Sequence, residues 1–233
     1  MIDSLMQIVA TTPLPQQIDQ LVGPDGISTA TKLFLGLTVL SLLPSIVMMF
    51  TCFVRLVIIF HLLRQAMGTQ TVPPNQVLTG LALILTVFVM MPVFEQVHTE
   101  AYLPYQAGEI DGDQALDAAI TPVKNWMLDN TRESDLALFL RLSQSERPAT
   151  RDDVPLAALV PAFLISELKT AFQIGFLLFL PFLVIDLVVS SVLLSMGMMM
   201  LPPVMISFPF KILLFVMIDG WNLLIHSIMQ SFR

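Results

Sequence analysis

Three long apolar stretches dominate the pattern of hydrophobic and polar positions along the chain. The first carries no charge over residues 33–54 and continues past Arg55 to Leu63. The second covers residues 77–94, and the third begins near Ala157 and reaches the C-terminus. A transmembrane helix needs about 20 apolar residues. The pattern therefore predicts membrane-class helices and, by a simple count, four spans.

Prolines interrupt these stretches at positions where continuous helices would otherwise be expected. Pro44 lies within the first stretch and Pro92 near the end of the second. The third stretch contains Pro161, Pro181, Pro202, Pro203 and Pro209. A proline inside a helix removes one backbone hydrogen bond and clashes with the preceding turn. We therefore expect a kink or break at Pro44, and two helical hairpins or broken helices in the third stretch.

The polar residues between the second and third stretches have a helical pattern of their own. Leu116, Ile120, Val123 and Met127 fall at i, i+4, i+7 and i+11, which places them on one face of an amphipathic helix. Apolar positions around Phe139 indicate a second, shorter helix. The chain thus divides into a polar lead-in at 1–31, a first apolar helical hairpin at 32–94, an acidic helical subdomain at 95–156, and C-terminal apolar hairpins with the methionine-rich stretch at 157–233.

The composition agrees with an all-α, membrane-class protein. Hydrophobic residues make up 55% of the chain and charged residues 12%, with a mean hydropathy of +0.80; soluble domains carry about 25% charged residues. Twelve acidic and five basic residues lie between Glu95 and Asp153, a difference that equals the formal net charge of −7. Nucleic acid binding requires a basic face, so this class of partner is excluded.

A methionine-rich stretch with helix breakers lies in the middle of the third apolar stretch. It is SMGMMMLPP, at residues 195–203. Methionine side chains are flexible and polarizable, so several together form an apolar surface that adapts to different shapes. Gly197 and the double proline oppose a continuous helix here. We expect a deformable apolar bend between Leu194 and Val204; the alternative is that these methionines only fill a core.

Five charged residues interrupt the third apolar stretch: Glu167, Lys169, Asp186, Lys211 and Asp219. A charge at the centre of a bilayer costs about 2.5–3.5 kcal/mol, so these segments should pack against protein, and we infer obligate oligomerisation. Glu167 and Lys169 are spaced i, i+2 and do not share a helix face, which predicts separate partners. Asp186 and Lys211 are opposite in sign and flank the bend. They could pair within one hairpin or between subunits, or each could lie at a helix end in water.

Signals for catalysis, metal binding and cofactors are lacking in the sequence. His61, His98 and His226 are scattered without ligand spacing, and no nucleotide-binding glycine motif occurs. We expect no enzyme, no metal site and no cofactor. Cys52 lies in an apolar run, so we expect its thiol to be buried. The first residues lack a basic region, so we expect no secretory signal peptide. Arg55 and Arg64 would place the first loop in the cytoplasm and the acidic middle on the far side of the membrane.

Several motifs resemble those of the FliP/SctR family of type III secretion export gates. The first signature comprises RQAMG at 64–68, PPNQVL at 73–78 and GLA at 80–82. The second comprises SELKTAFQIG at 166–175, PF at 181–182 and DL at 186–187. SMGMMM at 195–200, PFK at 209–211 and DGW at 219–221 complete the resemblance. It covers roughly residues 35–98 and 155–233, and the ending QSFR at 230–233 favours the flagellar branch.

This resemblance implies a ring of five copies, completed by FliQ-like and FliR-like subunits. Such a gate lies at the flagellar basal body in the bacterial inner membrane, partly on the periplasmic side, and works with FlhB-like and FlhA-like export components. Unfolded flagellar proteins would be its cargo. In the family the methionine stretch closes the pore, a role that the resemblance gives to Met196, Gly197, Met198, Met199 and Met200. It implies inter-subunit contacts for Asp186 and Lys211. Glu167 and Lys169 are expected, from their place in the apolar stretch, to make buried or inter-subunit contacts.

Two other functions remain open at this point. A small-solute or ion transporter would use the charges of the third apolar stretch as a relay. A purely structural scaffold would use the apolar faces for assembly and would form no pore.

Overall fold

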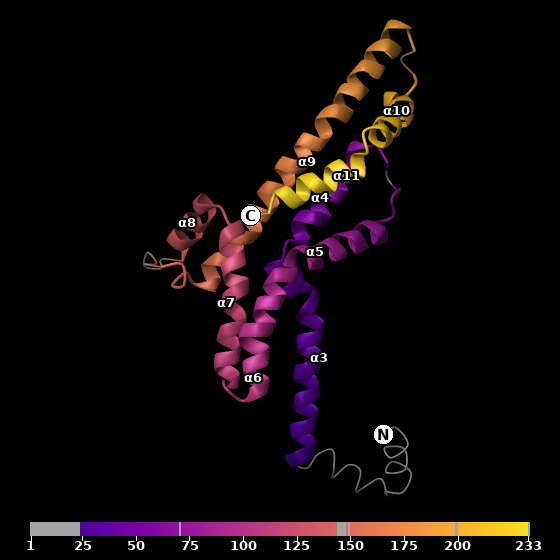
Figure 1. Cartoon of the computed structure of the whole chain (residues 1–233). Helices are drawn as coiled ribbons and strands as arrows, with labels where there is room; N and C mark the ends of the chain where they lie inside the picture. Colours follow the sequence, from indigo (N-terminus) through magenta and orange to yellow (C-terminus); the bar gives the residue numbers. More distant parts are fainter. Residues whose placement is uncertain (1–23, 70, 144–147, 149, 199, 233) are drawn as a thin grey trace, which may run out of the picture. The chain divides into compact units, whose positions relative to one another are not determined.

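The computed structural model describes residues 24–69, 71–143, 148, 150–198 and 200–232 (Figure 1). Within these ranges the secondary structure is helical and no strand occurs, so the all-α prediction is confirmed. Residues 1–23 of the predicted lead-in lie outside the described ranges. The helices are α3 (Pro24–Phe50), α4 (Phe53–Ala66), α5 (Asn75–Val97), η1 (His98–Tyr102), α6 (Leu103–Ala107), α7 (Gly112–Asn130), α8 (Glu133–Leu142), α9 (Leu156–Ser195), α10 (Pro203–Met217) and α11 (Gly220–Gln230).

The chain forms two compact units, Met1–Val47 and Met48–Arg233. The first contains most of α3. The second holds the hydrophobic core, in which α4 packs along α9 through buried apolar side chains such as Ile59, Phe60 and Phe163. The two helices approach closely at Gly175, where a Cβ atom would lie 2.2 Å from Leu62 Cδ1. A side chain at residue 175 would therefore force Leu62 to move.

The predicted helices of the acidic middle are present as α7 and α8. α7 begins with a capping box, in which the Asp111 side chain accepts from the Gln114 backbone and the Gln114 side chain accepts from the Asp111 backbone. The predicted apolar stripe is buried only towards the C-terminal end, because Met127 lies in the core whereas Leu116 is exposed. Trp126 packs edge-on against Phe163 of α9 with a centroid distance of 5.3 Å, which anchors α7 to the core.

The prolines break fewer helices than the sequence predicts. α3 continues through Pro44 and ends at Phe50, α5 continues through Pro92, and α9 is one helix of 40 residues that contains Pro161 and Pro181. The third stretch is thus unbroken at Pro161 and Pro181, and its predicted hairpin and bend occur later, between α9 and α10 and between α10 and α11. In apolar surroundings no water is present to bind free backbone N–H and C=O groups. A helix that continues through a proline loses one backbone hydrogen bond, whereas a break would leave several groups without partners.

α9 and α10 form a hairpin, and α11 follows α10 after a bend of 67° (Figure 1). The bend occurs at Asp219, whose φ of 51° and ψ of 54° are left-handed, an uncommon conformation for a residue with a side chain. Gly220 follows it, where a Cβ atom would lie 2.3 Å from the Phe215 ring. The absence of a side chain at residue 220 thus lets α11 start directly beside α10.

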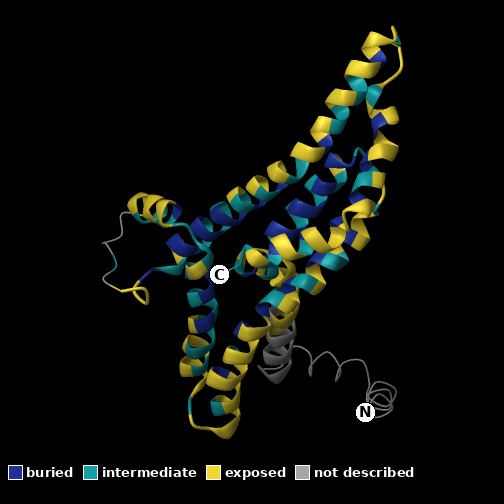
Figure 2. Ribbon diagram, turned by 45° about the horizontal axis from the view of Figure 1, so that its top comes forward, coloured by how far each residue is buried: buried dark blue, intermediate teal, exposed yellow. Residues whose placement is uncertain are grey.

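Two helices among the described residues are long and apolar enough to cross a membrane, namely Asn75–Ala107 and Leu156–Ser195. The number rises to four if each of two bent helix pairs forms one span, which is the number counted from the sequence. Many residues on these helices are exposed (Figure 2). They include large apolar side chains on α5, α9 and α10, for example Phe88, Phe176 and Val216. A surface of this kind needs lipid or other protein around it.

Candidate functional site

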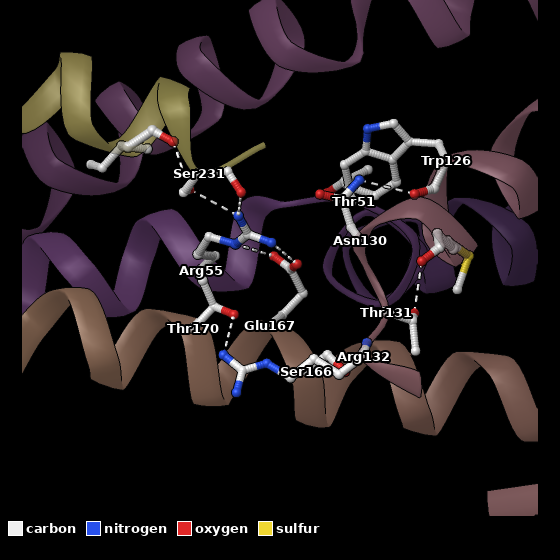
Figure 3. Close-up of polar contacts among 12 residues, drawn as sticks. Thr51, Arg55, Trp126, Asn130, Thr131, Arg132, Ser166, Glu167, Thr170 and Ser231 are labelled. Carbon is white, nitrogen blue, oxygen red and sulfur yellow. Dashed lines mark hydrogen bonds and ion pairs between the residues drawn. The ribbon is translucent and has the colours of Figure 1, made fainter. Parts of the chain in front are cut away.

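The deepest charged contact joins Arg55 of α4 to Glu167 of α9 (Figure 3). The Arg55 Nε atom donates to Glu167 Oε2 at 2.8 Å and its Nη2 atom donates to Oε1, so the pair is bidentate. The two side chains are 2% and 0% exposed. Bidentate pairing satisfies both oxygens of the carboxylate, which is what makes a buried ion pair tolerable.

The C-terminal segment closes over the other side of the Arg55 guanidinium. Nη1 of Arg55 donates to the backbone oxygen of Ser231 at 3.0 Å and to its hydroxyl at 2.9 Å (Figure 3). The Phe232 ring lies 4.1 Å from the guanidinium carbon, a cation–π contact. Arg55 thereby connects α4, α9 and the residues that follow α11.

A second charged cluster attaches α8 to α9. The buried Asp135 side chain accepts from Lys169 and, at 2.9 Å, from the Ser166 hydroxyl. Burial raises the pKa of Asp135, but the hydrogen bonds and charge of Lys169 and the bond from Ser166 outweigh it and hold that pKa below the usual value. Arg132 extends the cluster with bonds to Thr170 at 3.1 Å and Gln173 at 2.6 Å. At neutral pH Asp135 is therefore a carboxylate.

A third cluster lies across the α9–α10 hairpin. Lys211 of α10 donates to Asp186 Oδ2 of α9 at 2.6 Å and to the Ala66 backbone oxygen at the end of α4 at 3.1 Å. The Ser207 hydroxyl donates to the other Asp186 oxygen at 2.6 Å. Lys211 is buried, whereas Asp186 is 37% exposed. The pairing of Asp186 with Lys211 within one hairpin is thus the arrangement in this chain.

The methionine turn, residues 196–202, connects the ends of α9 and α10. α9 ends in a Schellman motif: the Gly197 amide donates to Leu194 O and the Met198 amide to Leu193 O, both at 3.0 Å. This motif requires a left-handed residue, and Gly197 has a φ of 73°. α10 then starts at Pro203, a favourable first helical residue. The predicted bend between Leu194 and Val204 is therefore present.

Two methionines of the turn, Met196 and Met200, are exposed to solvent. Met196 is 65% exposed and Met200 is 98% exposed, while Met198 is half-buried. Met199 lies outside the described residues. The alternative that these methionines fill a core does not hold for Met196 and Met200, which present a flexible apolar surface at the end of the hairpin.

The four predicted charged residues belong to three separate pairs, and Glu167 and Lys169 do have different partners. Since the chain itself supplies these counter-charges, neighbouring subunits are not needed for that purpose, which corrects one argument for oligomerisation. Sequence reasoning missed Asp135 and assigned Arg55 only to membrane topology. A signal for Arg55 did exist, because it is the only charge between Lys32 and Arg64 and the apolar surroundings of Glu167 demanded a cation.

Comparison with known proteins agrees with the motifs. The sequence model of the FliP family matches residues 36–228, which is most of the chain. The chain belongs to the FliP family. Among the parts of the chain that the structure describes, no three His, Cys, Asp or Glu residues lie close enough to hold a metal ion.

Three relatives in the FliP family are similar to the chain over most of its length. The flagellar biosynthetic protein FliP of Bacillus subtilis strain 168 is 54% identical over 209 residues, 90% of this chain and 95% of the relative. That of Pectobacterium carotovorum is 50% identical over 96% of this chain and 84% of its own length. That of Caulobacter vibrioides is 55% identical over 84% of this chain and 74% of the relative.

Proposed function

We propose that this protein is a core subunit of the flagellar type III protein export gate. In this role several copies, five by the family resemblance, form a ring with FliQ-like and FliR-like subunits in the bacterial inner membrane. FlhB-like and FlhA-like components would deliver unfolded flagellar proteins to it, and part of the chain would lie on the periplasmic side. The role is one of transport without catalysis.

The observation that carries the proposal is the exposed methionine turn at the end of the α9–α10 hairpin in a member of the FliP family. Met196 and Met200 are exposed in the single chain, and the backbone at Gly197 is held by a Schellman motif. Several such turns around an axis would form a hydrophobic constriction that excludes water. Because methionine side chains adapt their shape, the ring could seal around a passing polypeptide of any sequence.

Exposed apolar surface supports assembly into a larger complex in the membrane. It extends along both helices of the hairpin, for example at Leu187, Val188 and Leu213. Buried Glu167 and Lys211 are paired within the chain, so the hairpin can enter an apolar environment without exposing an unpaired charge at these positions.

Permeability measurements on cells that express variants of the methionine turn test the proposal. Deletion of Met198, Met199 and Met200 should make the membrane leaky to small ions, because the constriction loses its apolar seal. A matched control replaces Met205 and Met217, two exposed methionines of α10 outside the turn, by serine. Unchanged ion permeability with the deleted but correctly assembled gate would contradict the proposal.

A small-solute or ion transporter is the alternative function. A relay would need its charges free to exchange partners, but Glu167, Lys169, Asp186 and Lys211 are divided among three pairs within the chain. Charge-dependent uptake into vesicles that contain this chain alone would favour the transporter.

A further inference from the structure

Residues 95–117 are here called the acidic hairpin. They comprise the end of α5, η1, α6, the turn that follows and the first residues of α7. They include six acidic residues, and all six are exposed: Glu95, Glu100, Glu109, Asp111, Asp113 and Asp117. No lysine or arginine occurs between Arg64 and Lys124 in the sequence. The acidic hairpin is therefore strongly negative and has no lysine or arginine of its own to balance it.

Exposed aromatic and apolar side chains lie on the same hairpin. Tyr102 and Tyr105 are the two tyrosines of the chain, and each is 54% exposed, next to exposed Leu103. A groove of about 460 Å³ runs along the helix and is lined by Thr99, Leu103, Pro104, Gln106, Ala107 and Glu109. Tyrosine is enriched in protein interfaces, where it supplies a large contact area and a hydroxyl group.

The charges decide what kind of partner can cover this groove. Six carboxylates within 23 residues keep the hairpin out of the hydrocarbon layer, and the anionic lipids of a membrane surface would repel it. A second copy of this chain would be repelled as well, because its formal net charge is −7. The complementary partner is thus another protein with a basic surface.

We propose that the acidic hairpin is a docking surface for an amphipathic helix of another protein, with lysine or arginine beside its apolar side chains. Thr99, Leu103 and Gln106 follow one another at i, i+4 and i+7 along the groove, so its wall is elongated like a helix and suits helix-in-groove binding. The apolar side chains of the partner would contact Leu103 and the tyrosines, and its cations would meet Glu109, Asp113 and Asp117. In Figures 1 and 2 the acidic hairpin and the methionine turn lie at opposite ends of the second unit, so the two surfaces act separately.

Photo-crosslinking in living cells tests this docking surface. A benzophenone amino acid replaces Gln106, which is exposed and lines the groove, and the crosslinked peptide is identified by mass spectrometry. We expect a peptide of another protein in which lysine or arginine alternates with apolar residues at helical spacing. A peptide of a second copy of this chain, an acidic peptide or a lipid adduct would overturn the proposal.

Charge reversal provides the matched control. Asp113→Lys with Asp117→Lys should reduce the crosslink at least tenfold, whereas Glu133→Lys with Asp152→Lys should leave it unchanged. Asp113 and Glu133 both lie in the first turn of a helix, so the two variants perturb helix starts alike. If the basic residues of the identified peptide are replaced by glutamate in the partner protein, the crosslink to the Asp113→Lys, Asp117→Lys variant should return. Equal crosslinking in both variants would contradict the docking surface.

The docking surface rests on the proposed export function only in the choice of cells for the crosslinking experiment. The native mass and ion permeability of the gate report on the proposed function, while the crosslink reports on the hairpin. A gate that is assembled and sealed but shows no basic crosslinked peptide would overturn the docking surface alone.

Discussion

At the scale of single residues, Arg55 lies with its guanidinium between Glu167 of α9 and the segment that follows α11. Its charge would be costly in this environment without a counter-charge, and the bidentate contact with Glu167 supplies one. Phe232 covers the guanidinium face. The pair therefore fixes how three segments far apart in the sequence meet.

Replacing Glu167 by glutamine should lower the free energy of unfolding by about 3–5 kcal/mol, because Arg55 would then be a buried charge without a partner. Denaturant unfolding of the purified protein in detergent measures the change. Replacing both residues by apolar ones, Arg55→Met with Glu167→Leu, should recover most of the loss.

The ion pair of Arg151 with Asp129 is the matched control. Its side chains are 62% and 49% exposed, so Asp129→Asn should change the free energy of unfolding by less than about 1 kcal/mol. Equal losses in Glu167→Gln and Asp129→Asn would show that burial does not set the strength of the Arg55 contact.

At the scale of helices, the sequence predicts the element types better than their ends. The apolar runs and the stripe through Met127 indicate the helices, because their spacing reports which faces are buried. Prolines mislead inside α9, since the loss of one hydrogen bond at Pro161 or Pro181 does not outweigh the packing and hydrogen bonds of a 40-residue helix. By contrast, Gly197 and the double proline end and start helices as expected, because a left-handed glycine and a first-turn proline are local requirements.

Contacts between distant segments are the part of the candidate site that the sequence does not determine. The methionine turn is contiguous in the chain, so its residues can be named from the sequence alone. The partners of Glu167 and Lys169 come from α4 and α8, and which cation meets which carboxylate depends on how these helices cross α9. A single sequence carries no information on that crossing beyond the need for a counter-charge.

The crossing of α4 and α9 gives a prediction at the scale of helices. Gly175→Val should lower the free energy of unfolding by about 1–3 kcal/mol, because the added atoms collide with Leu62. Gly80→Ala in α5 serves as the control: nothing lies within 4 Å of the added Cβ atom, so better helix propensity should raise stability by up to about 1 kcal/mol. If Leu62→Ala, added to Gly175→Val, recovers the lost free energy of unfolding, the contact is confirmed. A Gly175→Val variant as stable as the original chain would contradict it.

At the scale of the whole molecule, exposed apolar surface is the property that demands partners. The charges within the third apolar stretch that are buried, Glu167 and Lys211, are satisfied by this chain itself. Exposed apolar side chains such as Phe88 and Phe176 are not covered within it. Lipid covers some of this surface in a membrane protein, and we expect neighbouring subunits to cover the rest.

The native mass of the detergent-extracted protein tests the ring most directly. It is measured first for the chain expressed alone and then for the chain expressed with its neighbouring export genes. The account predicts five copies of the 25.9 kDa chain that gain further small subunits on co-expression. A stable monomer or dimer that never gains partners would contradict it.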